Sequence, residues 1–133
     1  MFSKKFKKGK YYIGDPCYVV EKQDKWMELL EKTNYFKNEE QEYKGYPILA
    51  GSTAYGDGVY GDNEGRIYCV DAGLIGIMPI ECIDKKHDNI EDLGNIVEFE
   101  DDFDVSIEDG VFEFGNILIN TIWDEDEDED EDD

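Results

Sequence analysis

The last third of this chain has no basic residue. Residues 88–133 contain 21 Asp and Glu and no Lys or Arg, whereas residues 1–87 contain all 13 Lys and Arg against 14 Asp and Glu. The formal net charge of −22 is therefore concentrated in the C-terminal third. Because such a protein repels nucleic-acid phosphates and anionic membranes, we expect direct binding to neither, and a basic protein surface as its partner. The alternative is that the acidity only keeps the protein soluble.

Cysteine is also scarce. The chain has three cysteines, Cys17, Cys69 and Cys82, and no CxxC pair. This argues against a disulfide framework and a structural zinc site, and thiols fit the reducing cytoplasm, or the host cytosol if the protein is viral. No apolar segment reaches the length of a membrane span, and the N-terminal MFSKKFKKGK lacks the apolar stretch of a secretory signal.

The motifs of large enzyme families are missing. The chain contains no GxSxG, HExxH, P-loop or dinucleotide fingerprint. Its single histidine, His87, could pair with Cys17 as base and nucleophile, but a lone histidine in the charged stretch KKHDN is more often a surface residue. The sequence therefore favours a protein that is not an enzyme.

The chain does contain many short segments with the composition of β-strands. Runs of this kind include Lys10–Ile13, Cys17–Val20, Pro47–Ala50, Arg66–Asp71 and Leu74–Ile80. These runs, with frequent glycines between them, are typical of a β-rich domain.

One helix and one hairpin have clear local signals. Apolar residues in Lys25–Lys32 recur with helical spacing, which predicts an amphipathic helix there. Asp109-Gly110 lies between the runs Ile96–Ile107 and Val111–Ile122, which predicts a hairpin, and Gly115 marks a bulge or bend. We expect an α+β fold that is mostly β, a small bent antiparallel sheet or barrel with one amphipathic helix.

The expected organisation has three parts. Residues 1–9, with Lys4, Lys5, Lys7 and Lys8, predict a flexible basic arm, and residues 10–123 a single β-rich domain. Residues 124–133, DEDEDEDEDD, predict a disordered acidic tail because ten like charges in a row cannot collapse.

The stretch GDGVYGDNEGRIYCVDAG, residues 56–73, has the look of a metal loop. The spacing of Asp57, Asp62, Asn63 and Glu64 does not match a helix-flanked calcium loop, which makes the segment 61–65 most simply a turn. A second hypothesis is that three aspartates beside glycines, each at a strand end, meet to bind a divalent cation or to act as acid and base. These are Asp15, Asp57 and Asp71. The alternative is that each aspartate only binds the backbone of its own turn.

Tyrosine is abundant around these turns. Tyr18, Tyr55 and Tyr60 flank the glycine-rich motifs, and together with Asp15, Asp57 and Asp71 they are the residues that we expect to bind a ligand. Ordinary strand preference is the competing explanation for these tyrosines. We expect no cofactor, with a divalent cation as the one candidate.

The motifs YYIGDPCYVV, GDGVYGDNEGRIYCVDAG and LIGIMP together resemble a group of small, uncharacterised β-rich proteins of bacteria, phages and large DNA viruses. The resemblance covers roughly residues 11–79 and extends to the hairpin at 105–121. It implies a compact β-rich fold and implies no activity. The acidic tail is not part of the shared pattern.

Two functions follow from these features. The first is a non-enzymatic binding protein of the cytosol, phage or viral in origin, which engages a basic partner through its acidic C-terminal third. The residues expected to bind this partner are Asp124, Glu125, Asp126, Glu127 and Asp128. The second is a domain that binds a small ligand or divalent metal, or a hydrolase, built on the rim aspartates and tyrosines.

Overall fold

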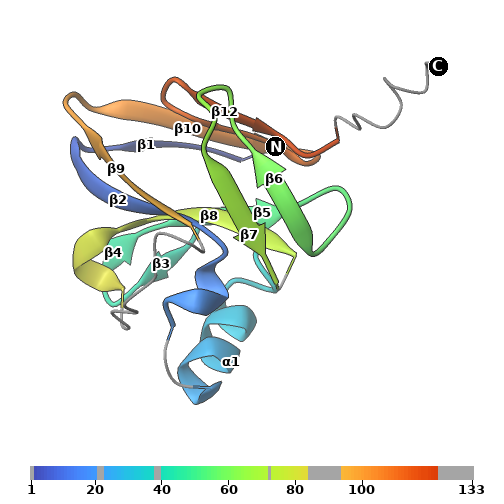
Figure 1. Ribbon diagram of the computed structural model, residues 1–133. Coiled ribbons are helices and arrows are strands. Elements are labelled where there is room, and N and C mark those ends of the chain that lie inside the picture. Colours follow the sequence, from blue (N-terminus) through green and yellow to red (C-terminus); the bar gives the residue numbers. More distant parts are fainter. Residues whose placement is uncertain (1, 21–22, 38–39, 72, 84–93, 123–133) are drawn as a thin grey trace.

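A computed structural model describes residues 2–20, 23–37, 40–71, 73–83 and 94–122 of the chain. Two four-stranded antiparallel sheets face one another, and one helix covers the far side of the second sheet (Figure 1). Within the described residues, no sheet closes into a barrel. The expectation of a mostly β, α+β fold with one amphipathic helix is confirmed.

The first sheet, here called sheet A, joins the two ends of the described chain. Its strands lie in the order β1 (Phe2–Phe6), β10 (Phe103–Glu108), β11 (Val111–Phe114) and β12 (Ile117–Asn120). The second, sheet B, has the order β5 (Leu49–Ser52), β8 (Leu74–Pro79), β2 (Gly9–Gly14) and β9 (Asn95–Phe99).

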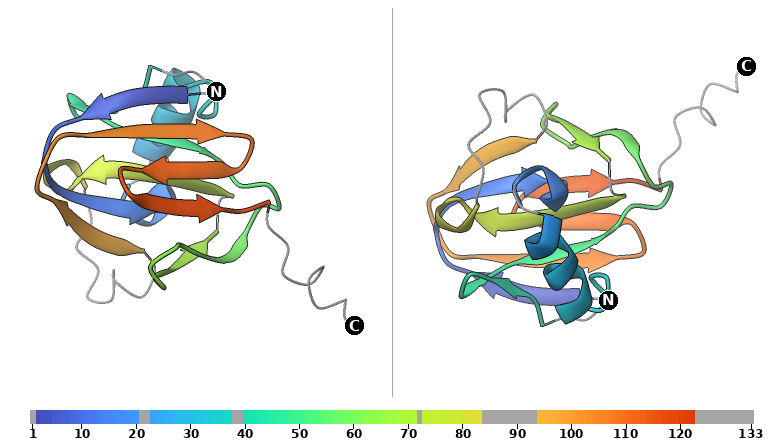
Figure 2. Two further views of the ribbon diagram at one scale, coloured as in Figure 1. Left: turned by 90° about the horizontal axis from the view of Figure 1, so that it is seen from above. Right: turned by 90° about the horizontal axis from the view of Figure 1, so that it is seen from below.

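The remaining elements surround the two sheets. Two hairpins are formed by β3 (Glu42–Tyr43) with β4 (Tyr46–Pro47), and by β6 (Gly58–Gly61) with β7 (Ile67–Val70). The helical elements are the 3₁₀ turn η1 (Pro16–Tyr18), the helix α1 (Gln23–Lys32) and the 3₁₀ turn η2 (Ile80–Cys82). Figure 2 shows sheet A on one side of sheet B and α1 on the other.

Sheet B is buried on both faces, which explains its long apolar runs. In β2, Tyr11 and Ile13 belong to the core between the sheets, whereas Tyr12 belongs to the core under α1. In β8, all six residues are buried, with Ile75 and Ile77 toward sheet A. Because neighbouring residues of a strand point to opposite faces, only a strand covered on both sides can be apolar throughout.

The prediction of a flexible arm over residues 1–9 is wrong, because residues 2–6 form β1 at the edge of sheet A. Phe6 is 1% exposed and stacks on Phe103, with 5.8 Å between ring centroids. Lys4 Nζ donates to the carbonyls of Gln41 at 3.0 Å and Ile48 at 3.1 Å, so one lysine of the cluster has turned inward to a polar site. The free energy gained by burying the Phe6 ring outweighs the electrostatic repulsion among the lysines.

Two further sequence predictions are corrected. Cys17–Val20 is not a strand: residues 16–18 form η1, because the Asp15 side chain caps Cys17 N and Pro16 fits the first helical position. The Asp109–Gly110 hairpin is confirmed, with φ of 51° and 87° at its two turn residues, but the long runs beside it are broken. The first run divides into β9 and β10, and β9 pairs with β2; the second divides at Gly115 into β11 and β12.

Candidate functional site

The motifs GDPCY and YCVDAG meet at the carboxylate of Asp15. This side chain follows β2 and is fully buried. Its Oδ1 accepts a hydrogen bond from Cys17 N at 3.0 Å, and its Oδ2 accepts one from Asp71 N at 2.8 Å. A buried carboxylate needs donors on its oxygens; one of these donors comes from its own turn and the other from a residue 56 positions away in sequence. We call this meeting point the Asp15 junction, comprising Tyr12, Asp15, Cys17, Tyr18, Cys69 and Asp71.

Two tyrosines enclose the junction. The Tyr12 hydroxyl donates to the Asp15 carbonyl at 2.9 Å, and burial, with the nearby charge of Asp15, raises the pKa of Tyr12. Tyr18 is half-buried; burial first, then the negative charge of Asp71, raises the pKa of Tyr18 to about 12. Both phenols therefore stay protonated at neutral pH and can donate hydrogen bonds.

The three aspartates predicted to meet are only partly brought together. The Asp15 carboxylate binds the backbone of Asp71, while the Asp71 and Asp57 side chains are exposed to solvent. Among the residues that the structure describes, no three Asp, Glu, His or Cys side chains are grouped so as to hold a metal ion. Both Asp15 oxygens accept hydrogen bonds from backbone N–H groups, and a cation site shared by Asp15, Asp57 and Asp71 stays a prediction.

The predicted tyrosines lie in different surroundings. Tyr18 is beside Asp15 and Asp71, whereas Tyr55 is 63% exposed at the turn before β6. Tyr60 turns its hydroxyl to the Gly56 carbonyl at 2.9 Å and packs against the core between the sheets. Of the predicted ligand-binding set, the structure brings together Asp15, Tyr18 and Asp71.

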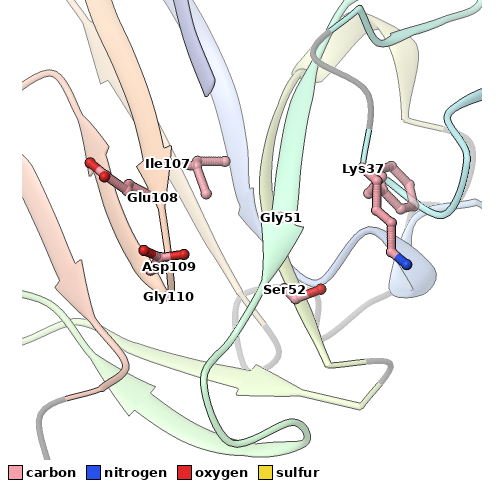
Figure 3. A pocket seen from close by; sticks show the side chains of 8 residues that line it. Lys37, Gly51, Ser52, Ile107, Glu108, Asp109 and Gly110 are labelled. Atoms are coloured by element: carbon pink, nitrogen blue, oxygen red, sulfur yellow. The ribbon is translucent and has the colours of Figure 1, made fainter. Parts of the chain in front are cut away.

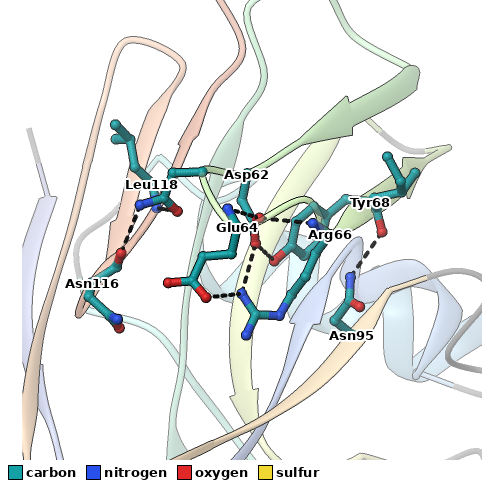
Figure 4. A network of polar contacts seen from close by, with 9 residues as sticks. Asp62, Glu64, Arg66, Tyr68, Asn95, Asn116 and Leu118 are labelled. Carbon is teal, nitrogen blue, oxygen red and sulfur yellow. Dashed lines mark hydrogen bonds and ion pairs between the residues drawn. The ribbon is translucent and has the colours of Figure 1, made fainter.

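The turn at residues 61–65 is held by Asp62, whose side chain is fully buried. Asp62 accepts hydrogen bonds from Tyr68 Oη at 2.6 Å and from the backbone N–H groups of Glu64 at 2.8 Å and Arg66 at 3.0 Å (Figure 4). Arg66 NH1 adds an ion pair at 3.2 Å. Burial alone would raise the pKa of Asp62, but the hydrogen bonds from Tyr68, Arg66 and Glu64 together lower it. These contacts agree with the sequence interpretation of this segment as a turn.

Two asparagines attach the β6–β7 hairpin to both sheets. Asn63 Oδ1 accepts from Leu118 N at 3.0 Å, its Nδ2 donates to the Asn116 carbonyl at 3.1 Å, and its backbone N–H donates to the Leu118 carbonyl (Figure 4). On the other side, Asn95 Nδ2 donates to the Ile67 carbonyl at 2.9 Å. The hairpin therefore connects β12, an edge of sheet A, with β9, an edge of sheet B.

The acidic residues of the last strands all face solvent. In sheet A the register pairs Ser106 with Glu113 and Glu108 with Val111, so Glu108 and Glu113 share the face away from the core. The described residues 94–122 contain eight carboxylates, and all are exposed: Glu98, Glu100, Asp101, Asp102, Asp104, Glu108, Asp109 and Glu113. An ion pair of 3.1 Å joins Asp104 to Lys5 of β1.

Two hollows flank the β10–β11 turn. The first, of about 340 Å³, lies on the outer face of sheet A and is lined by Ser106, Glu108, Asp109, Val111, Glu113 and Ile122. The second, of about 280 Å³, lies on the other side of the turn and is lined by Lys37, Gly51 and Ser52 on one side and by Ile107, Asp109 and Gly110 on the other (Figure 3). We call the first hollow and its three carboxylates the acidic face.

The cysteines of the junction carry a signal that the sequence analysis did not use. Cys17 lies two residues after Asp15, and Cys69 lies two residues before Asp71, so the two thiols frame the pair of aspartates that meet. The hypothesis of a Cys17–His87 couple stays a prediction, because His87 lies outside the described residues, as does the tail from Asp124 to Asp133.

None of the helices in the described part of the chain is long and apolar enough to cross a membrane. Comparisons of the chain with protein families, with curated proteins and with solved structures return no match.

Proposed function

We propose that this protein is a cytosolic binding protein that captures a lysine- or arginine-rich protein segment on its acidic face and acidic tail. The observation that carries the proposal is that Ile122 lines the same hollow as Glu108, Asp109 and Glu113. Ile122 is the last described residue, and the acidic run Asp124–Asp133 follows it directly in sequence. One continuous stretch of chain therefore links a fixed group of carboxylates to ten more.

The electrostatics favour a basic partner over other ligands. A surface of one charge sign attracts an oppositely charged partner, speeds its encounter and makes the association sensitive to salt. The apolar edge of the hollow, formed by Val111 and by Ile122, which is 47% exposed, can cover the aliphatic stem of a bound lysine or arginine. The tail residues Asp124, Glu125, Asp126, Glu127 and Asp128 are the nearest to this edge in sequence.

The proposal is tested by binding of a fluorescent decalysine peptide to the full chain at increasing salt. We expect Glu108→Gln with Glu113→Gln to weaken binding by roughly 2- to 10-fold at low salt, because each exposed charge pair contributes up to about 1 kcal/mol. Deletion of residues 124–133 is expected to weaken binding further and to flatten its salt dependence.

The matched control is Glu28→Gln with Glu31→Gln. Both residues are exposed on α1, which lies on the opposite side of sheet B from sheet A (Figure 2). This control variant also removes two negative charges from the protein. If it weakens binding as much as the Glu108 and Glu113 variant does, only the net charge matters. That result, or unchanged binding after removal of the tail, would overturn the proposal.

A further inference from the structure

Two thiols lie around the Asp15 junction and are not used by the proposed function. Cys17 is in η1 and Cys69 is in β7, and both are half-buried. The third cysteine, Cys82, is 0% exposed in the core under α1. All three are reduced thiols in the structure.

One carboxylate holds the segments that carry the two thiols. Asp15 binds Cys17 N through Oδ1 and Asp71 N through Oδ2, so these two backbone groups are fixed on either side of a single side chain. Along β7, Tyr68 and Val70 point into the core, which places Cys69 on the face of the strand opposite to them. Cys69 lies two residues before Asp71, whose backbone N–H binds Asp15 just after the end of β7.

Tyr12 and Tyr18 both lie near the sulfur atoms of Cys17 and Cys69. Burial first and then Asp15 raise the pKa of Tyr12, and burial first and then Asp71 raise the pKa of Tyr18; Cys17 and Cys69 add smaller effects to both. Both sulfurs therefore lie within electrostatic reach of the same pair of hydroxyl groups.

We propose that Cys17 and Cys69 are a peroxide-sensitive pair that closes to an intramolecular disulfide. One thiolate attacks a peroxide oxygen, the O–O bond breaks, and a sulfenic acid forms with release of water. The second thiolate attacks the sulfenic sulfur, the S–O bond breaks, and the S–S bond forms with release of a second water. Each disulfide consumes one hydrogen peroxide, which accepts the two electrons that the two thiols lose.

The bond requires the segments that carry Cys17 and Cys69 to move into disulfide geometry. A disulfide needs Cα atoms within about 7 Å and a defined torsion. Strand β7 pairs only with β6 in its two-stranded sheet, and the side chains of Asn63 and Asn95 fasten this hairpin to sheets A and B. Elements with few backbone bonds to the main sheets open and shift at lower cost than central strands.

The test uses the full chain treated with one to a few equivalents of hydrogen peroxide, alkylated, digested and mapped by mass spectrometry. We expect a peptide that links Cys17 to Cys69, while Cys82 is alkylated only after unfolding. The folded protein should form this link at least about 10-fold faster than the protein in urea, because folding holds the two thiols together.

Three variants give the proposal matched controls. Cys82→Ser should form the link at the wild-type rate, whereas Cys17→Ser and Cys69→Ser should form none and should retain the oxidised remaining thiol as a sulfenic or higher acid. Links through Cys82, disulfide-joined dimers in place of the internal link, or equal rates in folded and unfolded protein would overturn the proposal. The wild-type map decides the question even if a variant fails to fold.

Discussion

The fully buried carboxylate of Asp15 accepts a hydrogen bond of 2.8 Å from the backbone N–H of Asp71, across 56 residues of sequence. Replacing Asp15 with Asn puts an NH₂ group against one of two N–H donors, so one buried hydrogen bond is lost. We expect Asp15→Asn to lower the free energy of unfolding by about 2–3 kcal/mol, the range for a hydrogen bond to a charged group. Urea unfolding at neutral pH measures the change.

The control for this prediction is Asp71→Asn. Asp71 takes part through its backbone N–H, which the substitution keeps, and its side chain is exposed. We expect a change within about 0.5 kcal/mol, as for other surface substitutions. A loss equal to that of Asp15→Asn would contradict the role assigned to the Asp15 carboxylate.

The lowered pKa of Asp62 predicts a loss of stability in acid. A carboxyl group with a depressed pKa stabilises the folded state above its ordinary value, near 3.8, and this contribution disappears as pH falls through the lower folded value. Wild-type protein should therefore lose stability as pH falls below about 4. The Asp62→Asn variant should be less stable at pH 7 and should show a shallower fall in acid, as followed by thermal melting between pH 2 and 7.

Glu64→Gln provides the comparison, since Glu64 is exposed and its carboxylate lies 3.8 Å from Arg66. This variant should follow the wild-type curve, because a solvent-exposed ion pair contributes little. If Asp62→Asn runs parallel to wild type throughout, the buried network does not depend on the ionised carboxylate.

The raised pKa of Tyr18, about 12, predicts a loss of stability in alkali. Below pH 10 the phenol is protonated in both the folded and unfolded states, so the full stability is present. As pH rises from about 10 toward 12, the unfolded state loses this proton first and folding becomes less favourable. Tyr18→Phe should weaken this fall, and tyrosinate absorbance at 295 nm should show one fewer late-titrating phenol. Tyr55→Phe, a substitution at an exposed tyrosine, is the matched control and should leave the stability of the protein unchanged within about 0.5 kcal/mol.

The contacts of Asn63 predict that its side chain fastens the β6–β7 hairpin to sheet A. Asn63→Ala removes the bond from Leu118 N and the bond to the Asn116 carbonyl, and we expect a loss of about 1 kcal/mol because both sites are exposed. Hydrogen exchange at Leu118 N should accelerate. In Asn116→Ala the backbone carbonyl that accepts from Asn63 is retained, so equal acceleration in this variant would rule out the proposed contact.

Several elements could be predicted because their signals are local. The Asp109–Gly110 turn requires two residues that tolerate positive φ, and both have it. Phe103, Val105 and Ile107 alternate with polar residues, which is the local pattern of a strand with one buried face, and all three are buried. The helical spacing of Trp26, Leu29 and Leu30 predicted α1, which begins two residues earlier than expected.

Other features could not be predicted because they depend on partners distant in sequence. Charge alone made residues 1–9 look like a free arm, yet β1 pairs with β10 some hundred residues later and buries Phe6. The segment after Asp15 has strand-like composition, but a side-chain cap and a proline turn it into η1. The three aspartates share a sequence context, but only burial decides that Asp15 binds backbone while Asp57 faces water.

The sequence by itself determined the mostly β character, the helix, the β10–β11 hairpin and the concentration of negative charge in the last third. These follow from residue order, turn chemistry and composition, which act over a few residues. Only the tertiary structure decided that two motifs meet at Asp15, that Cys17 and Cys69 frame that meeting, and that Glu108 and Glu113 share one outer face beside Ile122. The physical reason is that a buried carboxylate must find donors, and a strand must find a neighbour, wherever in the chain these lie.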